Sequence, residues 1–358
     1  MATFSARVLS ITQDAYVPKV IDQTLDDNIF MFRQLSNGVP WRGERYKIPV
    51  MLSKNTNGSS YDGLDVLPAA QVETRQNMFY DPRAYSIGVT INGLEADVNN
   101  ISDSQVLSLI ETEMETAQIS MADSLGTIFY SDGTGNGNKD FNGAGNLNDD
   151  GSVATNIGNL SRTTYPKLAG VKSPSGGQLS LLLVSQLLTA TTRGSSLKQS
   201  PTILISDMAV WDFGEQLLQP AVRANYDANG YPMVSRNSKA PISGTAFKGS
   251  AGFKAIIYRG TPWVADMKST PQTLWTFNER YLEWAGIQSK RHKAITFAKG
   301  TNIDSVYDEI PSGVTGFQQR DWMESQNQDA EVAYIFLKGN LMAKRPGGDG
   351  RLTGITSA

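Results

Sequence analysis

A segment rich in glycine and asparagine is the first place where this sequence could hold a charged ligand. Residues Tyr130–Asp149 read YSDGTGNGNKDFNGAGNLND and contain five glycines and five asparagines. A phosphate-binding loop needs glycine before its lysine and a hydroxyl after it, because backbone amides wrap the phosphate and the hydroxyl reaches magnesium. Here Asn138 precedes Lys139 and Asp140 follows it. Asn138 also stands where a dinucleotide-binding loop has its third glycine, so neither kind of phosphate site is predicted.

The same segment matches a calcium-binding loop only in part. Asp140, Asn142 and Gly145 stand at suitable positions for an EF-hand. Ala144, however, replaces an oxygen ligand, and Gly151 replaces the bidentate glutamate. We therefore interpret residues 133–151 as a connector whose glycines supply positive φ angles, and calcium binding stays open as the alternative.

Residues suited to hydrolytic or redox catalysis are scarce. The chain has no cysteine and one histidine, His292, which lies in the basic stretch SKRHK. A G-x-S-x-G motif is absent, and a two-histidine metal site cannot be built. Catalysis would have to use carboxylates or lysines, and nothing singles out a pair. We expect no catalytic residues, no cofactor, no metal and no enzymatic activity.

The charge of the chain is nearly balanced in total but uneven along the sequence. A net charge of −3 and a sequence pI near 5.4 argue against a dominant basic surface that grips nucleic acid. Residues 84–138 hold eight acidic residues and no Lys or Arg, whereas residues 236–299 hold eleven basic residues against three acidic ones. Such oppositely charged segments could make contact between copies of the chain. The alternative is that both are simply solvent-exposed faces of one monomer.

The length and hydropathy pattern indicate a chain with a large core and no membrane span. With 358 residues it can bury a sizeable core without covalent cross-links. No window approaches eighteen consecutive apolar residues, and the first twenty residues lack the apolar centre of a signal peptide. Neither a membrane span nor secretion is therefore predicted.

The first ninety residues predict an arm and a hairpin with little core of their own. Residues 1–43 contain one short amphipathic run, Ile21–Leu35, that fits a helix. The segments Glu44–Leu52 and Val72–Ile91 have strand-like composition and flank a polar, turn-rich stretch. We expect a long β-hairpin over residues 44–91. Because an isolated hairpin is marginal in water, it needs a partner surface.

The strongest local pattern predicts a long helix over residues 102–130. Ser102 can cap its N-terminus, and Asp103 is favourable in its first turn. Apolar residues recur at spacings of three and four along one face: Val106, Ile110, Met114, Ala117, Met121, Leu125 and Ile128. The opposite face, interpreted as wetted or as part of an interface, is acidic: Glu111, Glu115 and Asp123.

Helix and strand patterns alternate through the rest of the chain, which indicates an α+β protein. Gln178–Thr191 predicts a helix, and Thr202–Ser206 predicts a short buried strand before a second helix capped by Asp207. Two strands are expected around a turn at residues 260–262, and Glu331–Lys344 predicts a long closing strand or strand pair.

Stretches spread along nearly the whole chain carry a resemblance to a known family. They are DSLGTIFYSDGTG at the end of the long helix, FNGAGNLNDDGSVATNIGNLSRTTYPKLAG after it, ILISDMAVW, IIYRGTPWVADM with LWTFNERYLEW, and VAYIFLKGNLMAKRPGGDGRLTGI. Their order and spacing resemble the major capsid proteins of tailed double-stranded DNA bacteriophages, which share the Hong Kong 97 fold. No single motif is decisive.

The resemblance implies an α+β fold of the Hong Kong 97 type with five parts. They are an N-terminal arm (1–43), an extended hairpin called the E-loop (44–91), a peripheral domain with the spine helix of about 102–130 and the Gly/Asn-rich connector (92–169), a mixed α/β axial domain (170–303), and a return to the peripheral domain with the C-terminal tail (304–358).

The resemblance also implies a structural, non-enzymatic function. The chain would assemble through pentamers and hexamers into an icosahedral shell that encloses double-stranded DNA without sequence-specific binding. The implied partners are further copies of the chain, a scaffold protein, a portal and a decoration protein, with no membrane. The implied location is the virion capsid, assembled in the host cytoplasm. Some relatives begin with a helical scaffolding segment that has no counterpart here, and the initial Met favours a separate scaffold protein.

Candidate subunit contacts follow from the hairpin, the acidic helix and the basic segment. They are Lys47, Lys54, Tyr61, Arg75, Glu111, Glu115, Arg259, Lys290, Arg291 and Lys293. The opposite charges predict salt-sensitive assembly rates. Some relatives join subunits by lysine to asparagine bonds, for which Lys54 and Asn340 are candidates by location alone.

Two other functions remain as alternatives. The same architecture would suit an encapsulin-like compartment that binds cargo enzymes in place of a genome. From a different class, a glycan-binding protein or a carboxylate-based glycan hydrolase could use the Gly/Asn-rich segment and tryptophans such as Trp41, Trp263 and Trp284. Such tryptophans more often anchor cores or turns.

Overall fold

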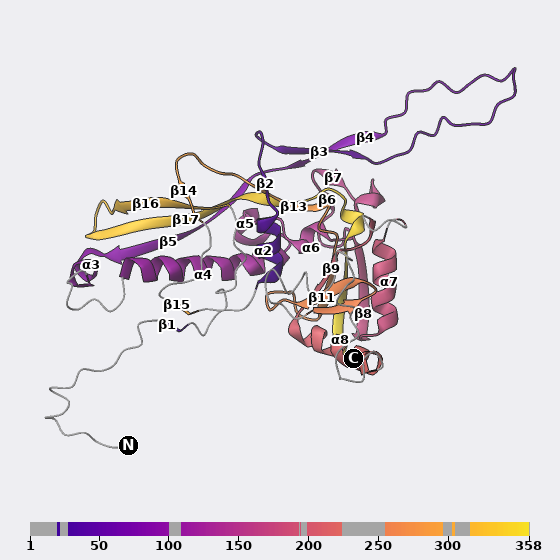
Figure 1. Cartoon of the computed structure of the whole chain (residues 1–358). Helices are drawn as coiled ribbons and strands as arrows, with labels where there is room; N and C mark the ends of the chain where they lie inside the picture. Colours follow the sequence, from indigo (N-terminus) through magenta and orange to yellow (C-terminus); the bar gives the residue numbers. More distant parts are fainter. Residues whose placement is uncertain are drawn as a thin grey trace, which may run out of the picture.

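The computed structural model describes residues 20–21, 28–99, 109–192, 194, 199–223, 255–295, 303–304 and 316–357. Two six-stranded sheets account for most of the strands (Figure 1). Much of the expected arm, residues 1–19 and 22–27, and the expected cap at Ser102 lie outside the described residues. Among the helices in these ranges, none is long and apolar enough to cross a membrane.

One sheet, which we name the long sheet, is built around strand β17. β17 (Ala330–Ala343) pairs antiparallel with three strands: β16 (Phe317–Glu324), β5 (Arg83–Asn92) and β13 (Leu282–Gly286). Two short strands extend it further: β14 (Lys293–Ala294) beside β16 and β2 (Val39–Pro40) beside β13. The closing segment predicted at Glu331–Lys344 is therefore one continuous strand.

Helix α4 (Leu109–Tyr130) runs along one face of the long sheet (Figure 1). Its Met121 and Leu125 are buried in the same core cluster as Leu337 of β17. This confirms the predicted helix over its described part, although Ile110, from the predicted apolar face, is 37% exposed. The residues of β17 that point away from α4 are more exposed, so the sheet has one covered face and one open face.

The second sheet, which we name the compact sheet, mixes parallel and antiparallel pairs in the order β10, β11, β9, β12, β18, β8. Its strands are β8 (Val171–Gln178), β9 (Ile203–Ser206), β10 (Ala255–Tyr258), β11 (Thr261–Ala265), β12 (Thr273–Phe277) and β18 (Gly350–Ser357). The predicted buried strand and the predicted strand pair around residues 260–262 are confirmed as β9 and as β10 with β11.

Two helices pack on the compact sheet and confirm the helices expected there: α7 (Leu181–Thr191) and α8 (Met208–Arg223). Ser180 caps α7, because its Oγ accepts a hydrogen bond from the Leu183 N–H at 3.2 Å. Gly214 allows α8 to approach the sheet closely, since a Cβ there would lie 2.4 Å from the ring of Trp263.

The hairpin corrects the expectation of a single second strand at Val72–Ile91. β3 (Tyr46–Met51) pairs antiparallel with β4 (Arg75–Tyr80), and the chain then leaves the hairpin at Asp81 and Pro82. Pro82 has no N–H to continue a strand ladder. β5, which follows, belongs to the long sheet, so the hairpin ends at residue 80 and not at residue 91.

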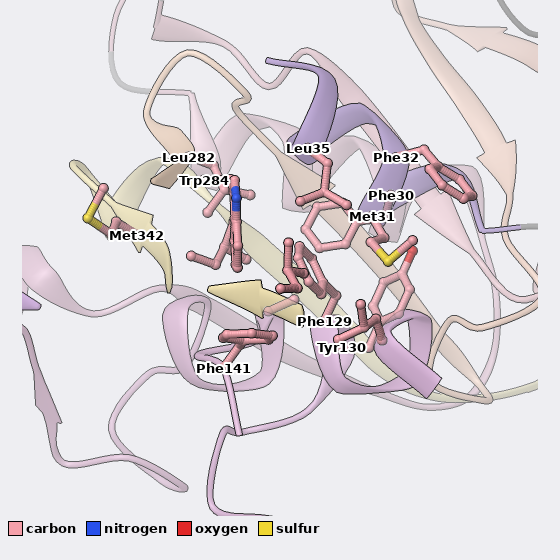
Figure 2. Close-up of a cluster of buried hydrophobic side chains, with 14 of the residues drawn as sticks. Phe30, Met31, Phe32, Leu35, Phe129, Tyr130, Phe141, Leu282, Trp284 and Met342 are labelled. Atoms are coloured by element: carbon pink, nitrogen blue, oxygen red, sulfur yellow. The ribbon is translucent and has the colours of Figure 1, made fainter. Parts of the chain in front are cut away.

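Helix α2 (Ile29–Ser36) joins the two sheets through an aromatic cluster (Figure 2). Phe30 stacks on Phe277 of β12 with ring centroids 4.6 Å apart and meets Phe129 of α4 edge-on at 6.3 Å. Phe129 in turn lies 5.4 Å from Trp284 of β13. The helix predicted at Ile21–Leu35 is confirmed from Ile29 onward, but its predicted start is wrong, because Ile21 lies in strand β1 (Val20–Ile21) and Asn28 caps α2; residues 22–27 lie outside the described residues.

The remaining elements are short: β1 (Val20–Ile21), β15 (Ile303–Asp304), α3 (Gly93–Asn99), α5 (Gly135–Asn138), α6 (Ala144–Leu147), β6 (Asn156–Ile157), β7 (Leu160–Ser161), and single 3-10 turns at Pro166–Leu168 and Pro346–Gly348. Strand pairing does not follow the expected domain ranges in the second half of the chain. β13, within the range 170–303, lies in the long sheet, and β18, within 304–358, lies in the compact sheet. The expected domain ranges stay a prediction.

Candidate assembly surfaces

The hairpin tip, residues 52–74, exposes apolar side chains. Leu64 is 100% exposed, Val66 95% and Tyr61 66%. Apolar groups this open are typical of a surface that another molecule covers. The predicted contacts Lys54 and Tyr61 both lie in this tip and are exposed.

The base of the hairpin carries the other two predicted contacts of this region. Lys47 on β3 and Arg75 on β4 are both exposed, and the Lys47 ammonium lies 5.6 Å from the centre of the Phe79 ring. Beside Lys47 is a pocket of about 750 Å³ whose lining includes Arg42 and Arg45. The base of the hairpin is therefore basic where the tip is apolar.

The predicted basic contacts do not form one surface. Arg259 lies on the turn between β10 and β11 with a positive φ of 51°, and its Nη1 donates to Ser185 Oγ at 2.8 Å and Thr189 Oγ1 at 3.2 Å on α7. This arginine therefore fastens a turn of the compact sheet to a helix. Lys290 and Arg291 lie at the long sheet instead and are exposed.

Lys293 and the two acidic candidates also belong to the region of the long sheet. The ammonium of Lys293 on β14 pairs with Asp321 of β16 at 2.7 Å, with both side chains about 70% exposed. Glu111 is exposed and Glu115 is half-buried, both on α4. The structure thus places acidic candidates on the helix and basic ones beside strand β14.

The second part of the Gly/Asn-rich segment is folded into the body of the protein, whereas residues 134–139 are exposed. Phe141 and Leu147 are each 1% exposed. The Arg83 guanidinium donates to the carbonyl oxygens of Gly133 and Asp140. Burial lowers the pKa of Arg83 despite the opposite effect of nearby Asp140. Because a side-chain cation already uses these carbonyls, the segment acts as an internal connector, and its geometry does not favour the calcium alternative.

The connector ends in a buried ion pair with a strand of the compact sheet. Asp149 accepts hydrogen bonds from the backbone N–H groups of Gly151, Val153 and Ala154, each at 2.9 Å, and pairs with Arg351 of β18 at 2.6 Å. Burial opposes ionisation, but these donors and Arg351 outweigh it and lower the pKa of Asp149. We call this pair and its neighbours the seam.

Two further carboxyl groups at the seam are fully buried. Asp266 accepts from the Phe30 N–H at 2.9 Å and from the Tyr130 hydroxyl at 2.8 Å, which links β11 to α2 and α4. Burial raises its pKa. Asp349 accepts from the Asn278 N–H at 2.7 Å, and burial raises its pKa to about 8. The Asp266 contacts tie the compact sheet to α2 and α4, and the Asp349 contact joins the ends of the neighbouring strands β12 and β18.

The structure also places the residues behind two weaker expectations. Asn340 is 1% exposed, donates from Nδ2 to Asp81 O at 2.9 Å, and accepts at Oδ1 from Asn142 N–H at 2.9 Å. A lysine of another copy therefore cannot reach its amide in this conformation. Trp263 and Trp284 are at most 1% exposed, so they serve the core and cannot form a glycan platform.

Sequence reasoning missed the seam and an aromatic group on the open face of the long sheet. Asp149 and Arg351 are about two hundred residues apart, so no local spacing pairs them. On the open face, the His292 and Phe336 rings stack with centroids 4.9 Å apart, and Tyr334 lies 6.0 Å from Phe336. The sequence signal available for the open face was the alternation of Tyr334, Phe336 and Lys338 with Ala333, Ile335 and Leu337 along β17.

Solved structures of shell proteins share this architecture along the full chain. No protein-family profile and no curated protein sequence matches it. A structure described as the cyanophage A-1(L) capsid asymmetric unit matches with a TM-score of 0.73 at 11% identity, covering 99% of this chain and 100% of that one. The capsid of a native GTA particle matches with a TM-score of 0.57 at 10% identity, covering 99% and 98%.

A compartment protein matches as well. The holo-SrpI encapsulin complex from Synechococcus elongatus PCC 7942 has a TM-score of 0.57 at 12% identity, with coverage of 99% of this chain and 97% of that one. The chain therefore has the α+β, Hong Kong 97-like fold, as the resemblance implied. At these identities the likeness establishes the fold.

Proposed function

We propose that this protein is the major subunit of an icosahedral capsid of a tailed double-stranded DNA bacteriophage. The observation that carries the proposal is the exposed hairpin tip, with Leu64 fully in solvent, on a chain whose fold matches phage capsid structures from end to end. A monomeric enzyme gains nothing from such a tip, whereas a shell subunit buries it on assembly.

Assembly energetics follow from many weak contacts. A few kcal/mol at each contact corresponds to about millimolar affinity, yet a subunit held by several neighbours at once dissociates very slowly from a closed shell. The buried hydrogen bonds and ion pair of the seam make the subunit rigid. A shell requires this, because its subunits must share one shape. The role is structural, and no reaction is assigned to the chain.

The finer assignments belong to the same proposal. The subunits form pentamers and hexamers, with the compact sheet in the axial domain and α4 as the spine of the peripheral domain. The shell encloses DNA without reading its sequence, as the net charge of −3 suits. A scaffold protein, a portal and a decoration protein are the expected partners, and the shell assembles in the host cytoplasm into the virion.

An encapsulin-like compartment is the second candidate, favoured by the likeness to the SrpI encapsulin complex. The cyanophage A-1(L) capsid structure has the higher TM-score, 0.73 against 0.57 for the encapsulin, so the phage capsid is ranked first. The two candidates predict the same shell with different contents. Portal and terminase genes beside the gene of this protein would favour the capsid, and an adjacent enzyme gene would favour the compartment.

Negative-stain electron microscopy with light scattering on the purified chain tests the proposal. We expect closed shells, or rings of five and six, when the chain is expressed with its scaffold protein. Nucleic acid recovered from purified shells would support the capsid, and a single enzyme would support the compartment. A chain that stays monomeric with scaffold, at high concentration and across salt, would contradict both.

A further inference from the structure

The two limbs of the hairpin tip are joined at few points. Beyond β3 and β4 they continue without strand pairing (Figure 1). At their base, Ser53 Oγ donates a hydrogen bond to Glu73 O at 2.9 Å. Between this base and the turn at residues 62–65, the one hydrogen bond across the limbs among the described residues runs from Asn57 Nδ2 to Ala70 O. Closure of the outer part of the tip therefore depends on a single side-chain amide.

The residue after Asn57 is glycine, and an Asn–Gly pair can modify itself. The Gly58 nitrogen attacks Asn57 Cγ and loses its proton to water, while Nδ2 takes up a proton and leaves as ammonia, which closes a succinimide ring. Water then opens the ring. Cleavage of the new Cγ–N bond gives aspartate, and cleavage at the main-chain carbonyl carbon gives isoaspartate, which places an additional CH2 in the main chain. Glycine favours the attack because it has no Cβ to obstruct the approach.

The nitrogen of Gly58 is free to make this attack. Within the part of the chain that the structure describes, its N–H has no hydrogen-bond acceptor. Gly58 is exposed, and apart from its chain neighbours no atom lies within 4 Å of the place where a Cβ would stand. The backbone can therefore rotate toward the ring-closing geometry without breaking a hydrogen bond of Gly58 or meeting a neighbouring group.

The sequence has five other Asn–Gly pairs, which serve as comparisons within the same chain. The pair at residues 229–230 lies outside the described residues. In two of the others the attacking nitrogen is already engaged. The N–H of Gly38 donates to Leu35 O at 3.2 Å, and that of Gly93 donates to Asp329 O at 2.9 Å. These hydrogen bonds hold the nitrogen away from the asparagine side chain, so both pairs should react slowly.

The two pairs of the connector are restrained by their backbone. Gly143 is tightly packed, since a Cβ there would lie 2.3 Å from Ser131 O. Asn136 and Gly137 are exposed, but they lie within α5 at positive φ angles of 50° and 67°. A backbone hydrogen bond of 3.0 Å closes the turn around them. Among the described pairs, Asn57 with Gly58 is thus the one with both an exposed position and an unrestrained nitrogen.

We propose that Asn57 is a self-modifying site, at which succinimide formation with Gly58 and hydrolysis by water release the outer link of the hairpin tip. Aspartate or isoaspartate at this position has no N–H to donate, and its carboxylate oxygens face the carbonyl oxygen of Ala70. Two acceptors repel each other, so the limbs separate. The tip also gains a negative charge in addition to those of Asp62 and Asp65.

In the proposed shell, the reaction would distinguish subunits that stay free from those that assemble. An assembled tip is covered by its neighbours, which restrains the backbone at Asn57 and limits the access of water. The reaction should therefore be slower in shells than in the free chain. This step rests on the proposed function, whereas the reaction itself is a property of the unassembled chain.

Peptide mass spectrometry of the unassembled chain tests the site. The protein is incubated in mildly alkaline buffer and sampled over days. Trypsin cleavage after Lys54 and Arg75 isolates residues 55–75, in which fragmentation separates Asn57 from Asn55. We expect a gain of about 1 Da at Asn57, appearing about tenfold or more faster than at Asn37 and Asn92. Equal rates at all described Asn–Gly pairs, or a faster reaction at Asn136, would overturn the assignment.

Two variants separate the reaction from its effect on the tip. Gly58→Ala keeps Asn57 and fits without strain, because Gly58 has no positive φ and open space around it. It should slow the reaction about tenfold or more, since a Cβ obstructs the approach. Asn57→Asp reproduces one product from the start, and it should speed hydrogen exchange in residues 52–74 as aged wild type does. Exchange as slow as in fresh wild type would overturn the link to Ala70.

Failure of this inference and failure of the proposed function give different results. A chain that forms shells but gains no mass at Asn57 when free would overturn the site and leave the capsid proposal standing. A chain that gains the mass but never forms shells would do the reverse. Where shells form, an equal rate at Asn57 in shells and in the free chain would overturn the shielding of the tip by assembly.

Discussion

The seam and the hairpin tip differ in how their side chains are accommodated within one chain. At the seam, Asp149 has three backbone donors and a buried arginine, all within one chain. At the tip, Leu64 and Val66 are open to solvent. The contrast indicates that the seam residues find their partners on folding, whereas the apolar side chains of the tip would be buried only on association. Stability should therefore depend on the seam, and association on the tip.

The largest effect should come from Arg351→Ala. This change leaves the buried Asp149 carboxylate without its cation, and breaking a buried pair in this way costs about 3–5 kcal/mol. Urea denaturation of the unassembled chain, followed by tryptophan fluorescence, measures it. Arg259→Ala is the matched control, because that arginine lies on an exposed turn and should cost less than about 1 kcal/mol. Equal losses for the two variants would contradict the importance of the seam.

Asp349→Asn should give the next largest effect, and its sign depends on pH. Burial raises the pKa of Asp349 to about 8, so the folded chain holds a proton that the unfolded chain releases near pH 4. Wild-type stability therefore falls as pH rises from about 4 to 8, and the asparagine removes this loss. We expect the variant to gain up to a few kcal/mol over the wild type between pH 5 and pH 9 in urea denaturation. Parallel pH profiles would show that Asp349 does not titrate in this way.

Leu64→Ser with Val66→Ser should leave stability within about 0.5 kcal/mol, because these side chains bury almost nothing in the free chain. Assembly, by contrast, should be strongly weakened, as light scattering against protein concentration would show. Thr270→Ser, a conservative change at an exposed residue outside the hairpin, serves as the control. A double serine variant that unfolds easily but assembles normally would reverse the contrast between tip and seam.

The smallest effect should come from Lys290→Glu, Arg291→Glu and Lys293→Glu together. If these exposed charges steer association, as the opposite charges along the sequence predict, assembly should be slower at low salt and little changed at high salt. Stopped-flow light scattering at two salt concentrations measures the rates. Unchanged kinetics at low salt would remove the electrostatic part of the argument.

Local patterns predicted much of the fold, and long-range pairing explains what they missed. The spacing of Met114, Met121 and Leu125 was enough to predict α4, since helix periodicity is local. Pro82 offered a signal for the break between β4 and β5 that the prediction did not use. The seam could not be predicted, because Asp149 and Arg351 are 202 residues apart and become neighbours only in the folded chain.

The candidate contacts show the same limit. Lys54 and Tyr61 were predicted as subunit contacts, and the structure places both among the exposed residues of the hairpin tip, while their role in association stays a prediction. Arg259 was grouped with Lys290 by sequence charge alone, yet its turn folds back on α7. Charge along a sequence does not identify a surface until strand pairing decides which residues share a face.

The order of strands bears on when this chain can fold during synthesis. β17 lies at the middle of the long sheet, and β18 lies between β12 and β8 in the compact sheet. Only six residues separate these two strands, near the end of the sequence. Both sheets therefore lack an inner strand until residues 330–357 have left the ribosome, although domains generally fold from the N-terminus first. Ribosome-bound chains that end before Ala330 should therefore remain protease-sensitive throughout.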